Sequence, residues 1–334
     1  MTLGVRALMP MSDYRPSVPQ PRDLWSARNA TEWSQVYMAQ QQNYVPRVKD
    51  LFASTPNIPL ITGCLDSGVA IKVSFHVIGG LITEYQLSSQ PRHAMFRDCG
   101  GGYGLDRSRS RKQELEAAIR NFHHVFNSHI CASHIGSFTV SYLSMALNAS
   151  INNIEILVGK AGEQESRDMY QIMKDWPETI EARVAIWHAG QLLRLFKLLD
   201  RLTSFQIIMV YHAGMVLFAY SLLSCVNGRV PASDSLFYLN DTPSTPIEEF
   251  VRDGSFEPML RSDFRGTERV SVSLLATEEA VGIISEVILN KSCNCEGLSK
   301  RLVDGLVKLL KDLASAIRVV ESNHFHEPGA FGSG

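Results

Sequence analysis

Apolar residues recur every three or four positions along most of the chain, which is the spacing of one face of an α-helix. This pattern predicts helices near residues 115–130, 176–196, 204–226, 277–290 and 297–320. No pair of alternating segments joined by a hairpin turn interrupts it. The predicted fold class is therefore all-α, a large irregular multi-helix bundle.

Residues 69–87 fit two patterns. Positions 69 to 77 alternate apolar and polar as in a strand, but the apolar residues also fall at helical spacing, as in Ile71, Phe75, Ile78 and Ile82. The run contains no proline and is longer than most strands. Its length favours a helix.

Residues 205–226 carry no charge and are long enough to cross a bilayer. The alternative is a central helix of a soluble core, apolar all round because its neighbours cover every side. A single span would leave the amphipathic helices on both sides unexplained, which favours the core helix and no membrane. Gly190 and Gly214 would let this helix pack closely against the preceding one.

The last predicted helix, residues 297–320, has leucines at helical spacing that predict a buried stripe, formed by Leu298, Leu302, Leu306, Leu309, Leu313 and Ile317. Another face carries basic residues, namely Lys300, Arg301, Lys308, Lys311 and Arg318. Such a face is usually solvated, but it also suits an acidic protein partner or coregulator.

Proline and glycine divide the chain. Residues 1–24 contain several prolines and are expected to be an irregular segment, and residues 323–334 a flexible tail. Between them, residues 25–322 form the predicted helical domain, and its first helix is expected to start at Asn29, which with Glu32 has the spacing of a capping box. Residues 228–268 are rich in Pro and Gly and are expected to form a long loop with short helical turns.

Composition adds few constraints on function. The 334 residues are 45% hydrophobic and 20% charged, as in an ordinary globular protein, and the net charge is -2. A freestanding nucleic-acid-binding domain usually has a strong basic excess, which this chain lacks. The six cysteines are scattered, so they are expected to be reduced thiols rather than a disulfide framework.

No set of residues has the spacing of a known catalytic or metal centre. His124, His129 and His134 lie five positions apart, which turns each away from the next on a helix, and Cys293 and Cys295 do not have zinc-site spacing. The prediction is therefore no metal site, no catalytic residue and no cofactor in this chain. The alternative is an enzyme on a helical scaffold, with an interhelical pocket lined by His76, His188 or His212.

One basic cluster is a candidate for nuclear import. It lies in a Gly- and Arg-rich stretch, residues 97–113, that is expected to be a loop, and consists of Arg107, Arg109, Arg111 and Lys112. The competing interpretation is a solvated loop without a partner.

Several segments, in order over residues 20–320, resemble the regulatory region of fungal C2H2-type transcription factors, the fungal-specific transcription factor domain or middle homology region. The strongest is residues 182–194, ARVAIWHAGQLLR, which is similar to the family pattern A-x-x-A-x-W-H-A-G-Q-x-x-R. Its motif positions here are Trp187, His188, Gly190, Gln191 and Arg194. His212, in Tyr211-His212-Ala213, matches the family's next helix.

The resemblance implies a non-catalytic regulatory domain that controls RNA polymerase II transcription in the nucleus. It would act through protein partners, coregulators or a small-molecule effector bound to its helical core, and as a candidate homodimer. Complete members carry zinc fingers before this region, and no C2H2 set is present here. DNA binding and zinc are therefore expected only through a missing N-terminal segment.

Overall fold

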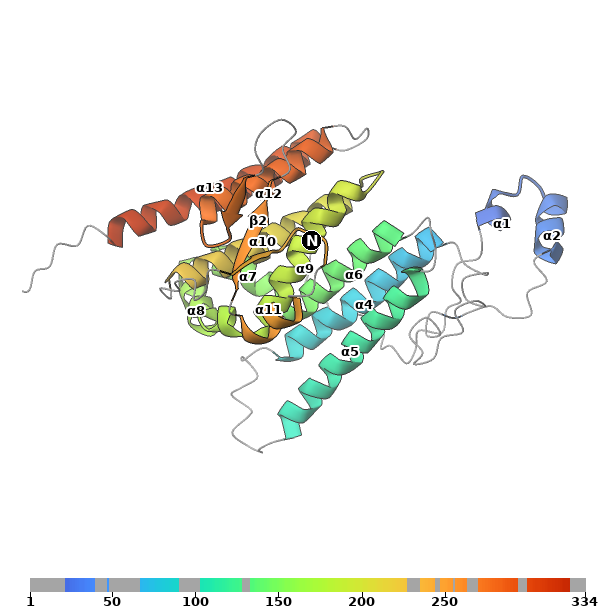
Figure 1. Cartoon of the computed structure of the whole chain (residues 1–334). Coiled ribbons are helices and arrows are strands. Elements are labelled where there is room, and N and C mark those ends of the chain that lie inside the picture. The colour runs from blue at the N-terminus through green and yellow to red at the C-terminus, as the bar shows by residue number, and fades with distance from the viewer. Residues whose placement is uncertain are drawn as a thin grey trace, which may run out of the picture. The chain divides into compact units, whose positions relative to one another are not determined.

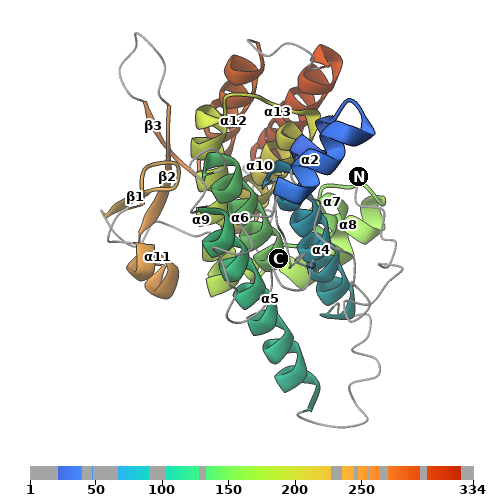
Figure 2. The same cartoon turned by 90° about the vertical axis from the view of Figure 1, so that its right-hand side faces the viewer.

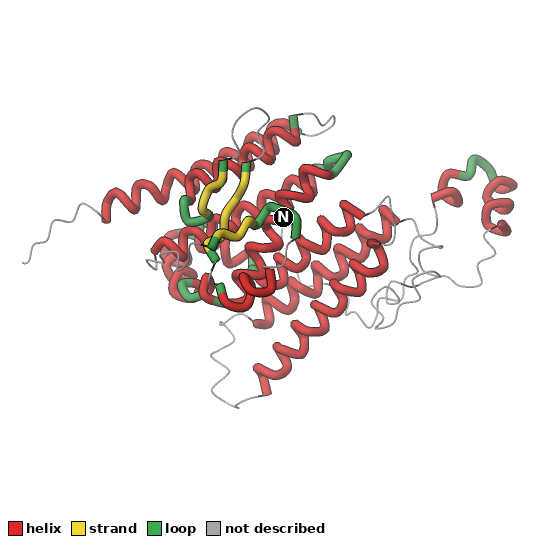
Figure 3. Tube along the Cα trace, viewed as in Figure 1, coloured by secondary structure: helices red, strands yellow, loops and turns green. Residues whose placement is uncertain are grey.

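The computed structural model describes residues 22–39, 47, 67–89, 103–127, 133–226, 235–243, 247–254, 256–262, 270–293 and 299–324. Helices predominate over one small sheet (Figures 1 and 3), which confirms the all-α class. The chain divides into two compact units, Met1–Leu147 and Asn148–Gly334. We call them the first and second units and describe each by itself.

The first unit is mostly helical in its described part. Helices α4 and α5 pack together, and Phe75 of α4 contacts Tyr142 of α6 with ring centroids 5.7 Å apart. The ambiguous residues 69–87 lie within α4, so the prediction of a helix there is confirmed. The bounds are α1 Arg22–Ser26, α2 Ala30–Ala39, α4 Ser67–Ser89, α5 Tyr103–Asn127 and α6 Ser133–Asn148.

The start of α2 has the predicted cap. The backbone N–H of Glu32 donates to Oδ1 of Asn29 at 2.8 Å, as an N-cap residue requires. The Glu32 carboxylate accepts from the backbone N–H of Arg28 at 2.8 Å, one residue before the position expected in a capping box.

The second unit is built around helix α10, Ser204–Val226, which contacts α7, α9, α12 and α13 (Figures 1 and 2). Its tight contact with two of these neighbours is at Gly214, where an added Cβ would lie 3.2 Å from both Ile284 and Leu310. The helical bounds are α7 Ile151–Leu157, α8 Glu163–Met173, a 3₁₀ turn Trp176–Glu178, α9 Ile180–Leu198, α10, α11 Ile247–Asp253, α12 Thr277–Ser292 and α13 Lys300–His324.

Helix α10 is the one helix in the described residues that is long and apolar enough to cross a membrane. Within its most hydrophobic 18-residue window, 83% is buried by the rest of the protein. This burial is typical of the core helix of a folded domain.

The small sheet was not predicted. Strand β2 (Glu257–Arg261) pairs parallel with β1 (Leu236–Tyr238) and antiparallel with β3 (Ser271–Ser273). Strands β1 and β2 lie within the Pro- and Gly-rich stretch 228–268, so the prediction of a loop is wrong for those residues, while the seven-residue α11 agrees with the short helical turns expected there. Strands of three to five residues are too short for alternation to be recognised.

The stripe predicted on α13 is also only partly right. The residues buried against α10 and α12 are Val303, Val307, Leu310 and Ala314. Leu309 is 51% exposed, and Leu302, Leu306 and Leu313 are half-buried. Two apolar stripes lie side by side on this helix, and the leucine stripe is the outer one. Leu298 and the side chain of Ile317 lie outside the described part.

Candidate functional site

The segment that carries the family resemblance forms most of helix α9. The helix begins at a defined cap, where Oγ1 of Thr179 accepts from the backbone N–H of Ala182 at 3.1 Å. Trp176 and Pro177 lie in the preceding 3₁₀ turn rather than at the start of α9 itself. The candidate site is the joint between α9 and the sheet. These two elements lie beside each other in Figure 2.

Gly190 is where the backbone of the sheet segment meets α9 most closely. A Cβ at Gly190 would lie 2.4 Å from the carbonyl oxygen of Leu239, the residue that follows β1. Glycine is therefore required here by space, not by its own backbone conformation. The prediction that Gly190 and Gly214 let α10 pack closely against α9 is wrong, because Gly190 lies against Leu239 and Gly214 lies against Ile284 of α12 and Leu310 of α13.

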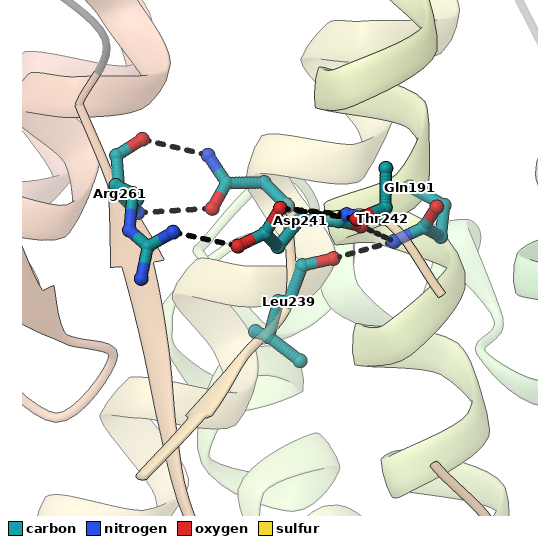
Figure 4. A network of polar contacts seen from close by, with 6 residues as sticks. Gln191, Leu239, Asp241, Thr242 and Arg261 are labelled. Atoms are coloured by element: carbon teal, nitrogen blue, oxygen red, sulfur yellow. Dashed lines mark hydrogen bonds and ion pairs between the residues drawn. The ribbon is translucent and has the colours of Figure 1, made fainter. Parts of the chain in front are cut away.

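Gln191 fixes the end of β1 to the same face (Figure 4). Its Nε2 donates to the carbonyl oxygens of Leu239 and Asp241, each at 2.9 Å, and its Oε1 accepts from Nε of Arg194 at 2.8 Å. A buried amide with both ends hydrogen-bonded is strongly oriented. Gln191 and Arg194 thus act as one unit that holds a turn of backbone.

The turn after β1 is held from its other side by β2. Asn240 donates from Nδ2 to the carbonyl oxygen of Arg261 at 2.8 Å and accepts from the Arg261 backbone N–H at 2.9 Å (Figure 4). The Arg261 guanidinium pairs with Asp241 at 2.6 Å and lies 3.9 Å from the centre of the Tyr238 ring. Hydrogen bonds from Ser271 and Arg261 lower the pKa of Tyr238.

Arg183 joins α9 to helix α11. Its guanidinium is buried and donates to the carbonyl oxygens of Val251 at 2.7 Å, Glu178 at 3.0 Å and Arg252 at 3.2 Å. Val251 and Arg252 belong to the last turn of α11, where helix carbonyls lack intrahelical partners. Arg183 therefore supplies the donors that the end of this short helix needs.

Besides the hydrogen bonds of Gln191 and Arg183, an aromatic cluster joins α9 to β1 and α11. Trp187 lies against Phe237 of β1, with ring centroids 5.5 Å apart, and Phe237 stacks on Phe250 of α11 at 4.4 Å. All three side chains are buried. The cluster adds apolar area to the joint, so the sheet segment and α9 form one packed structure.

The joint can hold backbone but offers little for chemistry. Its amide and guanidinium donors are directed at carbonyl oxygens, at Gln191 and at Asp241. Burial lowers the pKa of Arg194, and the Asp241 carboxylate opposes that shift. We therefore interpret the joint as a positioning device for the sheet.

The two histidines of the family pattern do not belong to this joint. His188 follows Trp187 on a different face of α9, and its Nδ1 is buried without a hydrogen-bond partner among the described residues, although part of the side chain stays accessible. His212 is buried on α10. Burial lowers the pKa of each to about 4, and at His212 the Glu155 carboxylate opposes the shift. His76, in the first unit, is exposed.

Lowering the pH from 7 to 5 is expected to destabilise the protein by about 3 to 4 kcal/mol through His188 and His212, with about 2 kcal/mol from each ring. Both folded-state pKa values, about 4, lie below the ordinary value of 6.5, so the unfolded chain takes up the protons first. The stability due to the neutral rings is complete above pH 6.5 and is lost as the pH falls from 6.5 toward 4. Urea unfolding at the two pH values measures this loss.

The variant His212→Gln should reduce the difference between pH 7 and pH 5, because glutamine does not titrate. The exposed His134 on α6 provides a matched control, and His134→Gln should keep the wild-type pH dependence. If His188→Gln and His212→Gln both retain the full pH dependence, the histidines are not its origin.

The candidate import cluster is helical. Helix α5 begins at Tyr103, so the prediction of a loop through residue 113 is wrong for residues 103–113. Arg109 is exposed, and Arg111 forms an ion pair with Glu114 at 2.9 Å, an i,i+3 contact that supports the helix. Lys112 is half-buried, and the side chain of Arg107 lies outside the described part.

No group of three or more His, Cys, Asp or Glu among the described residues could hold a metal ion. His129 and Cys295, two of the residues tested for metal-site spacing, lie outside those residues, as do residues 1–21 and 325–334.

The sequence interpretation missed Arg183, Asp241 and Arg261. The first had a recognisable signal: Arg183, Trp187, Gly190 and Arg194 recur at three or four positions, so a charged residue shares a face with a buried tryptophan and a glycine. Asp241 and Arg261 had no such signal, because they lie in short strands and turns.

No family model, curated protein or solved structure matches the chain. The resemblance to the fungal regulatory domain accordingly stays a prediction from the sequence.

Proposed function

We propose that this chain is the regulatory and interaction domain of a fungal transcription factor. It controls RNA polymerase II transcription in the nucleus without catalysis, through protein or small-effector binding to its helical core. Sequence-specific DNA contact belongs to a zinc-finger segment outside this chain. The observation that carries the proposal is the segment 182–194, whose match to the family pattern coincides with α9, the helix that packs against the central helix α10 and against the sheet.

The joint between α9 and the sheet supports this role physically. A regulatory domain needs an element with two arrangements whose balance a ligand can shift. A three-stranded sheet with strands this short is not stable alone, so it depends on α9 for its packing. A partner that contacts the sheet acts on α9 through Gly190 and Gln191, and through α9 on the core.

Helix α13 offers a second surface for a coregulator. Its exposed residues include Lys300, Arg301, Lys308 and Lys311, which suit an acidic partner, with Asp304 and Asp312 among them. The side chain of Arg318 lies outside the described part.

The full chain fused to a heterologous DNA-binding domain tests the proposal on a reporter gene in a fungal host. Reporter transcription is expected to differ from that with the DNA-binding domain alone. The variant Gln191→Met, which loses the donors to Leu239 and Asp241, should reduce the difference, and Gly282→Ala on α12 should keep it. Unchanged transcription from a fusion that is abundant and promoter-bound would contradict the proposal.

A further inference from the structure

Helix α13 has an apolar face that its own unit covers only in part. Val303, Val307 and Leu310 are buried, while Leu309, the residue before Leu310, points to another side of the helix and is half-exposed. Successive residues of the outer stripe are four, three, four and three positions apart. This is the spacing at which the side chains of two helices interlock in a coiled coil. The stripe comprises Leu302, Leu306, Leu309, Leu313 and Ala316. Gly305 lies beside it, and a Cβ there would meet no atom within 4 Å.

One edge of this face carries charges in a specific order. Arg301 and Asp312 are exposed and lie eleven residues apart, just over three full turns, so they share one flank of the stripe. They stand at opposite ends of the stripe and have opposite signs. Lys308 lies between them on the same flank, near the small Gly305.

We propose that this face of α13 binds the same face of a second copy of the chain, with the two helices antiparallel about a two-fold axis near residues 306 and 307. The two-fold brings the flank of one helix against the same flank of the other, reversed in direction. Arg301 then meets Asp312 of the second copy, and the pair occurs twice. Lys308 falls opposite Gly305, which leaves room for its aliphatic stem.

A parallel arrangement does not fit these residues. Its two-fold axis runs along the helices, so the charged flank of one copy would face the opposite flank of the other, where Val303 and Leu310 are already buried within their own unit. Arg301 would lie level with Arg301, and no opposite charge would be available to it. The antiparallel arrangement removes the apolar stripe from water and satisfies the charges together.

The arrangement is tested by sedimentation of the full chain between about 1 and 100 μM, the range in which weak dimers dissociate. Arg301→Asp and Asp312→Arg are each expected to weaken association about tenfold, because each places two like-charged pairs across the interface. An equimolar mixture of the two variants should regain wild-type association, since both pairs are then opposite in sign. The double variant should regain it as well.

Two further variants separate the interface from general charge effects. Leu309→Glu should abolish association, while Lys311→Glu, on the far side of the helix, should leave it unchanged. A monomer at all concentrations overturns the proposal, as does a dimer that Arg301→Asp and Asp312→Arg leave intact. Weakened single variants without rescue in the mixture overturn the antiparallel pairing. None of these outcomes depends on the proposed transcriptional role.

Discussion

The variant Gly190→Ala is expected to lower the free energy of unfolding by about 3 kcal/mol, the upper part of the range for overpacking in a core. The added methyl carbon would lie 2.4 Å from the Leu239 carbonyl oxygen and 2.5 Å from its carbonyl carbon. The obstacle is backbone, which cannot move aside as a side chain can. Relief requires β1 to retreat from α9, which also lengthens both bonds that Gln191 donates. Urea unfolding measures the loss.

Gly282 provides the matched control. It lies in the interior of α12, also a helix of the second unit, and an added Cβ there would meet nothing within 4 Å. Gly282→Ala should therefore be neutral or stabilise by up to about 1 kcal/mol, the helix preference for alanine. If both alanine variants are equally stable, the sheet does not approach α9 as closely as described.

The helices were predictable because their apolar faces repeat over many turns. Helix α10 spans Ser204–Val226, the range predicted from its long apolar and uncharged run. Helix α4 was correctly distinguished from a strand by length alone. The cap at Asn29 was predictable because a capping side chain needs only its local sequence.

The partners of each face were not predictable, because they depend on residues far away in the chain. The glycine in the pattern indicated a close approach, but the approaching group, Leu239, is 49 residues further on in a segment without recognisable periodicity. On α13 the inner and outer apolar stripes have the same helical spacing. Only the positions of α10 and α12 decide that Val307 is covered and Leu309 is not.

The basic cluster at the start of α5 was wrongly predicted to lie in a loop, because its composition was a poor guide to its secondary structure. Its glycines and serines suggested a loop, but Arg, Lys, Gln and Glu are good helix formers and dominate the residues that follow. The ion pair between Arg111 and Glu114 also belongs to the helical form.

The variant Arg183→Met is expected to destabilise the protein by about 3 kcal/mol. It leaves three carbonyl oxygens, those of Glu178, Val251 and Arg252, without their guanidinium donor, and each such loss costs about 1 to 3 kcal/mol. Removal of a buried charge returns part of that cost, because the guanidinium no longer has to be stripped of water. The cost of the three unsatisfied carbonyl oxygens is expected to exceed this gain, because methionine fills the volume of arginine but donates no hydrogen bond.

The loss should be concentrated in α11. This helix has seven residues, too few to be stable without tertiary contacts. Gly254 follows it, and its φ of 63° and N–H bond to the Phe250 carbonyl oxygen (3.0 Å) complete the cap. Arg183 packs against Gly254, where a Cβ would lie 3.0 Å from Nη1. Amide hydrogen exchange in Ile247–Asp253 should therefore accelerate more than exchange in α12.

Two variants distinguish the geometry of the guanidinium from its charge. Arg183→Lys keeps the charge but cannot reach three carbonyl oxygens from one ammonium, so an intermediate loss is expected. Arg167→Met removes an arginine that pairs with Glu163 on the exposed face of α8, and should change stability by less than about 0.5 kcal/mol. Wild-type stability of Arg183→Met would mean that the cost of burying the guanidinium equals what its three hydrogen bonds contribute, and that α11 is held by Phe237 and Phe250 alone.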